Sequence, residues 1–502
     1  MEHYDDIVVG SGISGLTLAH LLGLNGHKVL LLEKSRYIGG SMSRYVRKGI
    51  PVDTGFHFTG GFLNKGVLHD MLSVLGVNDY IQPVYLSDEK GQKYAFESDQ
   101  ATYSMPNGVK DFCSKLKEYF PQETEGIDHF FNLAKRIYEE TLSLDLLKIS
   151  QSPKSLDEDY ISLKDTLDKL FKNNHIKTIL GTYCMCYGGK PSEVSIANHC
   201  RVAYGLYDAV VRIKNGGDAF VKAFKDHFEP LGINIKKGTF ISECADIKNN
   251  RVGRFVLNTG EEVTCDQCIF TIHPKEVLKT LPKDHLSKAF VQRVEDFESS
   301  IGFFSVHGVV ESEPEAESNG FTPGIVSIFP SDDLDQLLDP DNVESSVLVL
   351  MKSLETRKGK IHKILTAMEP AFVEQVEKWK DSKTGKRPKS YYEYKEKRVA
   401  SIEKRILDYY PEYKDTYRTI SAASILTYRD YLNSHDGAAY GVKQKMGQFN
   451  LFGKLPLRNV YAAGQSSILP GVVGAMMSSF LVSRTIIGRE KYDNFIRDRI
   501  IR

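Results

Sequence analysis

Apolar residues near the start of the chain form two uninterrupted runs with an apolar, helix-length segment between them. The runs cover residues 7–9 and 29–32, and neither alternates with polar residues. Such continuous runs are typical of strands that a parallel sheet buries on both faces. Residues 16–22 between them suit a buried helix that ends at Gly23. The pattern therefore predicts a strand–helix–strand unit at the N-terminus.

The turn between the first strand and the helix carries three glycines. Gly10, Gly12 and Gly15 have the G-x-G-x-x-G spacing, which permits a tight turn, close approach of a pyrophosphate and close packing of the helix on the strand. The free N–H groups and positive end of that helix would hold the phosphates. Glu33 closes the second strand, where an acceptor for ribose hydroxyls belongs. Together these features predict a dinucleotide site.

Patterning along the rest of the chain predicts a helical part followed by a strand-rich part. Residues 65–200 are expected to be mostly helical. Helices are predicted at 68–75, 108–120, 128–147 and 163–171, and later at 361–380 and 395–409. Strands are predicted at 252–258 and 262–271 as a hairpin, and at 303–310, 324–329 and 346–351 as an antiparallel sheet walling a substrate lobe. Near the C-terminus we expect a strand over 459–465 and a long apolar helix from Pro470.

Length and composition limit the classes of protein to consider. The chain has 502 residues, more than one core usually serves, so at least two lobes are expected. Lysine plus arginine and aspartate plus glutamate both number 65, which gives no support for a nucleic-acid partner. The chain enters its first strand at once, so no signal peptide is expected. The best candidate membrane span, 471–483, is uncharged but shorter than the roughly 20 residues a bilayer requires.

Seven cysteines, an odd number at irregular spacing, predict reduced thiols in a cytosol-like compartment. Cys184 and Cys186, with His199-Cys200 nearby, match no common zinc spacing. Cys265 and Cys268 are separated as C-x-x-C, but residues i and i+3 of a strand face opposite sides. Core thiols are favoured over metal ligands or a redox pair, and no metal site is predicted.

Two further motifs give the chain a family resemblance. Glu33-Lys34 is followed by Gly39-Gly40, and then by an Asp-Thr-Gly-x-His-x-x-Gly segment over 53–60. This order resembles the FAD-dependent phytoene desaturase family, and within it the retinol saturase and carotenoid isomerase branch. Near the C-terminus, Tyr-x-x-Gly-Gln over 461–465 and Gly-x-x-Gly-Ala over 471–475 resemble the C-terminal flavin motif of the same branch. The resemblance frames the whole chain, although the middle matches only in outline.

The resemblance implies an FAD cofactor held by both ends of the chain. The double glycine would run beside the ribityl chain and flavin ring, Phe240-Ile241 would touch the adenine, and the helix beginning near Gly471 would face the flavin. The predicted cofactor-binding residues are Gly10, Gly12, Ile13, Ser14, Gly15, Glu33, Lys34, Gly39, Gly40, Ser41, Met42, Phe240, Ile241, Gly464, Gln465, Gly471, Val472 and Val473. His57, Tyr428 and Tyr440 are candidate proton donors or substrate contacts.

The predicted fold is α/β, with a discontinuous Rossmann-like FAD-binding domain of the glutathione-reductase type and an inserted α+β substrate-binding lobe. The FAD-binding domain is expected to comprise residues 1–85, 205–290 and 455–490. The cap lobe would comprise 86–204 and 291–454, and a basic tail would cover 491–502.

The predicted function is an FAD-dependent oxidoreductase that acts on C=C or C–C bonds of a hydrophobic polyene, isoprenoid or lipid. Saturation or cis–trans isomerisation is favoured over desaturation. The alternatives are a flavin amine oxidase, which would need an aromatic cage although Trp379 is the only tryptophan, and a non-catalytic FAD-bound or chaperone-like protein. Because only one dinucleotide fingerprint is present, the electron donor or acceptor is expected to be external.

Attachment to a membrane is a further hypothesis. Lysines and tyrosines gather over 380–394, and the tail over 489–502 mixes arginine with Phe and Ile. Either segment could rest on anionic lipid, or be a solvated linker and a solvated helix end. The expected location is cytoplasmic, possibly peripheral on the inner face of a membrane.

Overall fold

A mixed sheet built on the N-terminal strand carries the glycine turn. The computed structural model describes residues 1–62, 66–87, 91–149, 155–311, 321–342, 346–448 and 450–500. In this part of the chain the sheet has the order β10-β11-β12-β1-β2-β9, with β19 paired to β12 and β18 to β19. Its strands are β1 Glu2–Val9, β2 Val29–Glu33, β9 Asn234–Lys237, β10 Ile241–Ala245, β11 Arg254–Leu257, β12 Glu262–Phe270, β18 Gly453–Lys454 and β19 Val460–Ala462.

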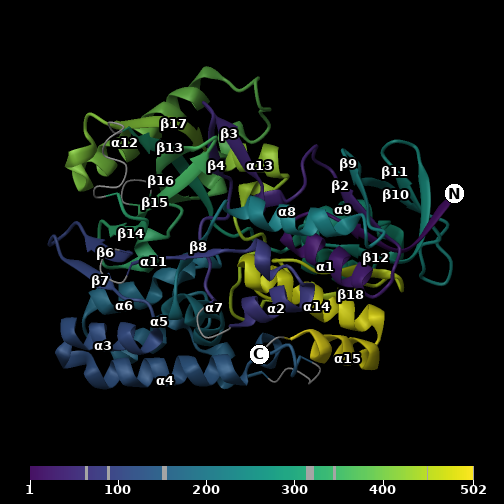
Figure 1. The fold of residues 1–502 in the computed structure, drawn as a ribbon, viewed down its shortest axis with the longest axis horizontal. Helices are drawn as coiled ribbons and strands as arrows, with labels where there is room; N and C mark the ends of the chain where they lie inside the picture. Colours follow the sequence, from purple (N-terminus) through teal and green to yellow (C-terminus); the bar gives the residue numbers. More distant parts are fainter. Residues whose placement is uncertain are drawn as a thin grey trace.

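The centre of this sheet is parallel and buried. β1 runs parallel to β2 and β12, and β12 runs parallel to β19. Three helices pack together beside these strands: α1 Ile13–Leu24, α8 Gly217–Phe228 and α14 Gly471–Ile487 (Figure 1). The glycine turn therefore lies at the carboxyl end of β1, at the edge where α/β sheets bind their ligands.

A second sheet forms most of the upper left of Figure 1. Its order is β17-β13-β16-β15-β14-β6-β7, antiparallel except for the β14–β6 pair. The strands are β6 Gln92–Phe96, β7 Thr102–Met105, β13 Gly302–Val310, β14 Gly324–Phe329, β15 Leu348–Arg357, β16 Lys360–Ala371 and β17 Tyr417–Ala423. The predicted antiparallel sheet is present. It also contains four strands that were not predicted, namely β6, β7, β16 and β17.

Helices cover the second sheet and fill the region below it in Figure 1. They are α3 Val109–Tyr119, α4 Thr124–Glu140, α5 Leu163–Leu170, α6 Asn174–Gly181, α7 Ile196–Asp208, α11 Leu334–Leu337, α12 Lys389–Tyr409 and α13 Ile425–Leu432. The remaining elements are β3 Arg44–Arg47, β4 Ile50–Asp53, α2 Val67–Leu75, β5 Pro83–Tyr85, β8 Val211–Ile213, α9 Pro274–Thr280, α10 Lys288–Glu295 and α15 Arg489–Arg499.

One predicted helix is wrong, and another is shorter than predicted. Residues 361–380 form β16 and a 3-10 turn, because the apolar run 364–368 is buried between β13 and β15. A short buried run cannot be assigned to helix or strand by periodicity alone. The stretch 65–200 also contains β5, β6 and β7, and α4 ends at Glu140 rather than at 147.

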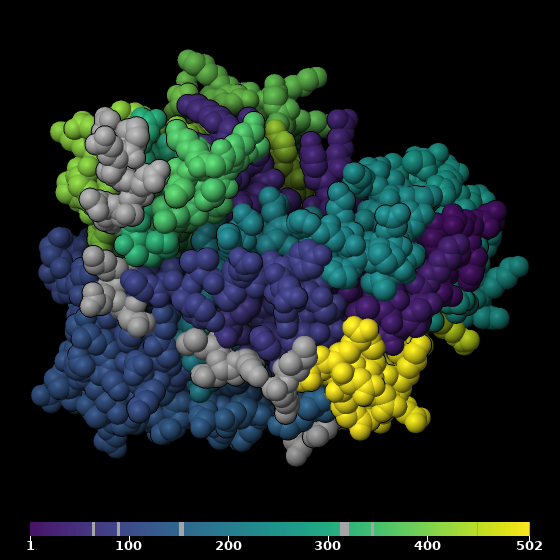
Figure 2. Space-filling model, in the orientation of Figure 1, coloured from purple at the N-terminus to yellow at the C-terminus, as the bar shows by residue number. Residues whose placement is uncertain are grey.

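The basic tail is a docked helix. Tyr492 and Ile496 of α15 are buried, and α15 packs on α14 and α2. Figure 2 shows it, in yellow, on the surface beside the purple N-terminal region. Because these apolar side chains lie against the core, they are not available for contact with lipid. Of the two hypotheses for the tail, a solvated helix end is therefore favoured over a lipid-binding segment. Residues 501 and 502 lie outside the described chain.

The predicted division into an FAD-binding domain and a cap lobe stays a prediction. β1, β2, β9, β10, β11, β12 and β19 fall within the segments assigned to the first domain, and the second sheet falls within those assigned to the cap. Among the described helices, none is long and apolar enough to cross a membrane.

Candidate functional site

A single large cavity connects the glycine turn of the first sheet with one face of the second sheet. Its volume is about 2030 Å³, well above the roughly 300–1,000 Å³ of an ordinary small-molecule pocket. The turn after β1 and the N-terminus of α14 line one part of it, and strands β6, β13, β14, β15, β16 and β17 line another. The volume is therefore sufficient for a dinucleotide and a second molecule.

The glycine turn is tightly packed at Gly15 and open at Gly12. A Cβ atom on Gly15 would lie 1.8 Å from the carbonyl oxygen of Gly10, whose φ is +99°. A Cβ atom on Gly12 would meet nothing within 4 Å. Gly10 and Gly15 thus serve the fold, whereas Gly12 leaves an open position at the helix N-terminus, as the pyrophosphate of a dinucleotide requires.

Glu33 is held in place by the backbone around it. The amide N–H of Ser11 donates to Glu33 Oε2 at 2.9 Å, and the amide N–H of Ser35 donates to Oε1 at 2.7 Å. The side chain is buried, yet it lines the cavity. Next to it, Lys34 Nζ lies 5.7 Å from the centroid of the Phe240 ring, which is exposed. This end of the cavity therefore presents a carboxylate, a cation and an aromatic face, a donor set that suits a ribose and an adenine.

Motifs from the two ends of the chain meet around the turn. Gly39 N–H donates to the carbonyl of Ser11 at 2.9 Å, which places residues 39–42 against the turn. From the other end, Ser479 on α14 contacts Ser14 on α1, with their Oγ atoms 2.7 Å apart. The amide of Gly464 donates to Ser478 Oγ at 2.7 Å. The fold thus unites segments that lie more than 400 positions apart in the sequence.

Nearly all the predicted cofactor-binding residues line this cavity. Gly15 and Gly39 do not line it, and both support the turn from behind. The lining residues are Gly10, Gly12, Ile13, Ser14, Glu33, Lys34, Gly40, Ser41, Met42, Phe240, Ile241, Gly464, Gln465, Gly471, Val472 and Val473. Their role in binding a cofactor remains a prediction.

His57 lies in the cavity wall above a ring of buried charges. Its Nδ1 is 3.8 Å from Asp53 Oδ2, and its Nε2 is a buried atom with no hydrogen-bond partner in the described chain. Burial of His307 on β13, and the charge of the neighbouring His57, lower the pKa of His307 to about 3. His57 and His307 are therefore neighbours.

The ring consists of Asp53, Arg212, Glu355 and Arg44, each in contact with the next. Arg212 is 2.7 Å from Asp53 and 2.5 Å from Glu355, and Arg44 is 2.9 Å from Asp53 and 2.7 Å from Glu355. All four side chains are nearly buried. Burial alone would raise the pKa of the Asp53 carboxyl, but Arg212 and the other cations hold it far below its ordinary value. Asp53 is thus a fixed anion beside His57.

The two candidate tyrosines lie at different places in the cavity wall. Tyr428 is partly buried on α13, and its hydroxyl is 2.5 Å from Ser305 Oγ on β13. Tyr440 is partly buried beside Cys186, and its backbone amide donates to Ser300 Oγ at 3.0 Å. Burial raises the pKa of both phenols, so both are neutral hydrogen-bond donors.

Sequence reasoning missed the polar residues on the second sheet. Gln92 and Tyr94 on β6, with Tyr183 after α6, line the cavity and contact one another. Ser305 and His307 on β13 were not singled out either. Alternation of residues along β6 is the signal that could have found the first two, but the segment was assigned to a helical region.

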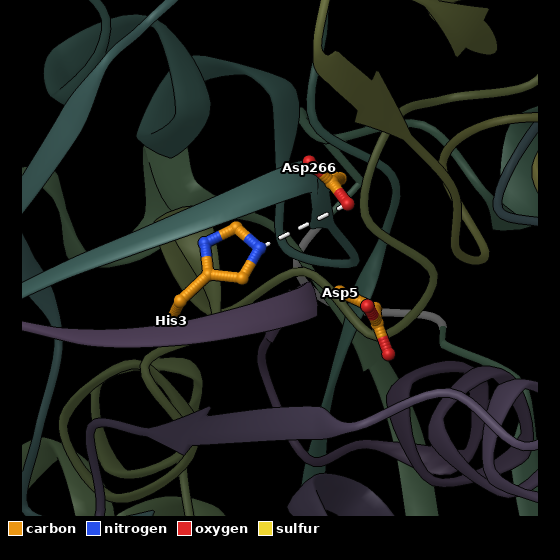
Figure 3. A group of neighbouring side chains, drawn as sticks. All are labelled: His3, Asp5 and Asp266. Atoms are coloured by element: carbon orange, nitrogen blue, oxygen red, sulfur yellow. Dashed lines mark ion pairs between the residues drawn. The ribbon is translucent and has the colours of Figure 1, made fainter.

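Another polar cluster lies on the surface, away from the cavity lining. Figure 3 shows the side chains of His3, Asp5 and Asp266, whose ligand-type atoms lie within 4.8 Å of one another. His3 Nδ1 already contacts Thr264 Oγ1 at 2.9 Å, and His3 and Asp266 are exposed. All seven cysteines are free thiols, and among the described residues none belongs to a cluster with metal-ligand spacing.

Comparisons with known proteins agree with this geometry. A family model described as an NAD(P)-binding Rossmann-like domain matches residues 8–75. The all-trans-retinol 13,14-reductase of Danio rerio is 25% identical over 97% of this chain and 86% of its own. The chloroplastic prolycopene isomerase 2 of an Oncidium hybrid cultivar is 34% identical over 30% of this chain and 25% of its own.

The chain is thus similar to an all-trans-retinol 13,14-reductase over nearly its whole length and to a prolycopene isomerase over 30% of it. This confirms the resemblance that the motifs indicated. Among solved structures, putrescine oxidase bound to putrescine has a TM-score of 0.64 at 14% identity, covering 96% of this chain and 98% of its own. That similarity supports the fold, and the predicted Rossmann-like α/β class is confirmed.

Proposed function

We propose that this protein is an FAD-dependent oxidoreductase or isomerase that acts on double bonds of a hydrophobic polyene or isoprenoid. The observation that carries the proposal is the continuity of the cavity from the glycine turn to the second sheet. The names of the relatives, a retinol reductase and a prolycopene isomerase, support substrates of this chemical class. Saturation and cis–trans isomerisation are therefore favoured over desaturation.

FAD fits the residues that surround the turn. Gly12 and the N-terminus of α1 would hold the pyrophosphate, Glu33 a ribose, and Phe240-Ile241 the adenine. Residues 40–42 and the N-terminus of α14 would border the flavin ring. When bound, FAD supplies hydride transfer at a carbon centre. The chain itself then needs to bind the substrate, exclude water and supply a proton.

His57 is the residue proposed to hold that proton. Its unpartnered Nε2 belongs to a side chain that lines the cavity, and Asp53 lies on the Nδ1 side of the ring. A carboxylate kept ionised beside an imidazole orients the ring. We assign Asp53 as a positioning residue, and Tyr428 and Tyr440 as substrate contacts or alternative donors.

The decisive experiment combines cofactor analysis with substrate conversion. The purified protein should be yellow and should release FAD on denaturation. After anaerobic reduction of the flavin, incubation with all-trans-retinol or prolycopene should change the number or the geometry of the double bonds. A colourless protein that takes up no FAD on reconstitution would contradict the proposal.

An amine oxidase is the second candidate, because its fold is shared. The chain's only tryptophan, Trp379, is buried against Tyr391 and Tyr394 and does not line the cavity. It therefore forms no part of an aromatic cage there. Hydrogen peroxide formed from amines in air would favour this second function.

The cavity opening supports a membrane surface as partner. Val46, Tyr392 and Tyr431 line the cavity and are also exposed, and Arg47 and Lys395 accompany them. Aromatic and aliphatic side chains beside cations are typical of proteins that rest on anionic lipid. We propose peripheral attachment at this opening, with an external electron donor or acceptor. Flotation with anionic liposomes should fail for a V46S/Y431S variant if this opening is the contact.

A further inference from the structure

The part of the cavity between β6 and the 3-10 turn Thr182–Cys186 carries polar side chains. The side-chain amide of Gln92 contacts the hydroxyls of both Tyr94 and Tyr183. All three side chains line the cavity, and each is at least 91% buried. Polar groups in such a place are stable only when hydrogen-bonded.

The three residues do not satisfy one another completely. Both N–H groups of Gln92 are directed to the two phenols, and the hydroxyls of Tyr94 and Tyr183 are 3.5 Å apart. Within the described residues, no protein group donates to Gln92 Oε1, and no acceptor is matched to the hydroxyl hydrogen of Tyr183. One acceptor and one donor thus remain available at the cavity wall.

The face of the second sheet gives these residues a defined position. Gln92 is paired with Ile325, which is paired with Met351, and Thr366 follows on β16. His307 on β13 is the next residue in this row. Four inter-strand steps of ~4.8 Å separate β6 from β13, or roughly 19 Å. Apolar side chains fill most of the middle of this face, namely Ile325, Val349, Met351 and Met368.

We propose that Gln92, Tyr94 and Tyr183 form a subsite for the terminal hydroxyl group of an isoprenoid alcohol. A hydroxyl group accepts from Tyr183 and donates to Gln92 Oε1, which matches the one donor and one acceptor that remain. The apolar chain of the ligand then crosses the sheet face toward His307 and His57. This subsite rests on the proposed function, because it specifies which polyene or isoprenoid the same cavity takes.

Burial keeps the phenols in the form that the subsite needs. It raises the pKa of Tyr94 to about 12 and that of Tyr183 well above its ordinary value. Both groups therefore remain neutral donors throughout the physiological pH range. A carboxylate on the ligand would find no cation among the residues of this subsite, so an acid is disfavoured.

The test is a binding comparison on the FAD-loaded protein with three ligands of one carbon skeleton. The ligands are geranylgeraniol, its aldehyde, and the hydrocarbon in which CH₃ replaces CH₂OH. The alcohol is expected to bind most tightly and the hydrocarbon most weakly, by roughly ten- to a hundredfold between them. Equal affinity of the wild-type protein for alcohol and hydrocarbon would overturn the subsite, and this result needs no variant to fold.

Two substitutions assign the effect to named groups. Y183F and Q92L should each remove most of the preference for the alcohol and leave binding of the hydrocarbon unchanged. Y103F is the matched control, because Tyr103 lies on the neighbouring strand β7 and does not line the cavity. An alcohol preference that survives in both variants would overturn the assignment. FAD content is measured in every sample, so that loss of the cofactor, which would contradict the proposed function itself, is recognised separately.

Discussion

At the scale of single residues, His57 and His199 show that two histidines with little exposure can be hydrogen-bonded very differently. His57 has a free Nε2 in the cavity wall, whereas His199 is bonded on both sides. Tyr207 donates to the carbonyl of Leu180, so His199 Nε2–H must donate to Tyr207, and its Nδ1 accepts from Tyr187. Burial alone therefore does not identify a functional histidine.

Replacement of His57 should affect catalysis more than cofactor binding. We expect H57Q to lower kcat by about 10²–10⁴, the range for loss of a positioned acid or base, with FAD still bound. The pH dependence of kcat should lose one limb as well. Stopped-flow conversion of the polyene across pH measures both effects.

The control for His57 is H285Q, which changes an exposed histidine. It should leave kcat unchanged. If H57Q keeps wild-type kcat over the whole pH range, the proton passes through Tyr428, Tyr440 or solvent.

His199 should make the fold sensitive to acid. Burial lowers its pKa to about 3 in the folded protein, against about 6.5 when unfolded. The unfolded state therefore binds one more proton between these values, and stability falls by up to about 1.4 kcal/mol per pH unit as the pH drops from 6.5. Urea unfolding at several pH values should show a smaller slope for H199Q.

His20, His273 and His307 have pKa values lowered by burial too, so H199Q should reduce the slope without abolishing it. H285Q again serves as control and should leave the slope unchanged. A slope that H199Q does not alter would show that His199 is protonated in the folded protein.

At the scale of elements, two glycines of the strand–turn–helix unit have different roles: Gly15 is needed for folding and Gly12 for ligand binding. Gly15 is required because any side chain would collide with the Gly10 carbonyl. Gly12 has a φ of −63°, which alanine adopts easily, and open space around its Cα. Its lack of a side chain is therefore explained by a ligand rather than by the chain itself.

This difference predicts opposite results for two alanine variants. G12A should fold with a thermal midpoint close to that of the wild type but lose most of its FAD affinity. G15A should unfold at a clearly lower temperature, because the helix must move away from β1. Thermal unfolding of the apoprotein and FAD titration measure the two effects.

Equal loss of stability in both variants would contradict this division of roles. So would FAD affinity in G12A that matches the wild type, since the open space above Gly12 would then lie away from the pyrophosphate.

At the scale of the whole molecule, the ring of four buried charges joins segments distant in the sequence. Asp53 is the last residue of β4, Arg212 lies on β8, and Glu355 lies on β15 of the second sheet. Two cations and two carboxylates make the ring neutral. It connects β3, β4 and β8 to the second sheet, beside His57.

Breaking the ring should be costly, because it leaves a buried cation without its partner. We expect E355Q to lower the free energy of unfolding by about 3–5 kcal/mol. D408N is the matched control, since Lys404 and Asp408 form an exposed pair worth less than about 1 kcal/mol. Urea denaturation of the apoprotein compares the two, and equal effects would mean that the ring is solvated.

The sequence by itself determined the parts whose chemistry is local. Gly10, Gly12, Gly15 and Glu33 follow one another within a single strand–helix–strand unit, so their spacing alone predicts a dinucleotide site. The strand, turn and helix around Gly464 could be predicted equally well, because they follow one another directly in the sequence. The helix over 109–119 could also be predicted, since one of its faces is apolar and the other polar.

The tertiary structure alone decided what depends on contacts between distant segments. β16 reads as a helix in isolation and becomes a strand only because β13 and β15 bury it on both sides. The charged ring and the Gln92–Tyr94–Tyr183 subsite consist of residues that are ordinary in sequence and become distinctive through burial and mutual approach. Pairing and desolvation are properties of the packed molecule, and no local pattern encodes them.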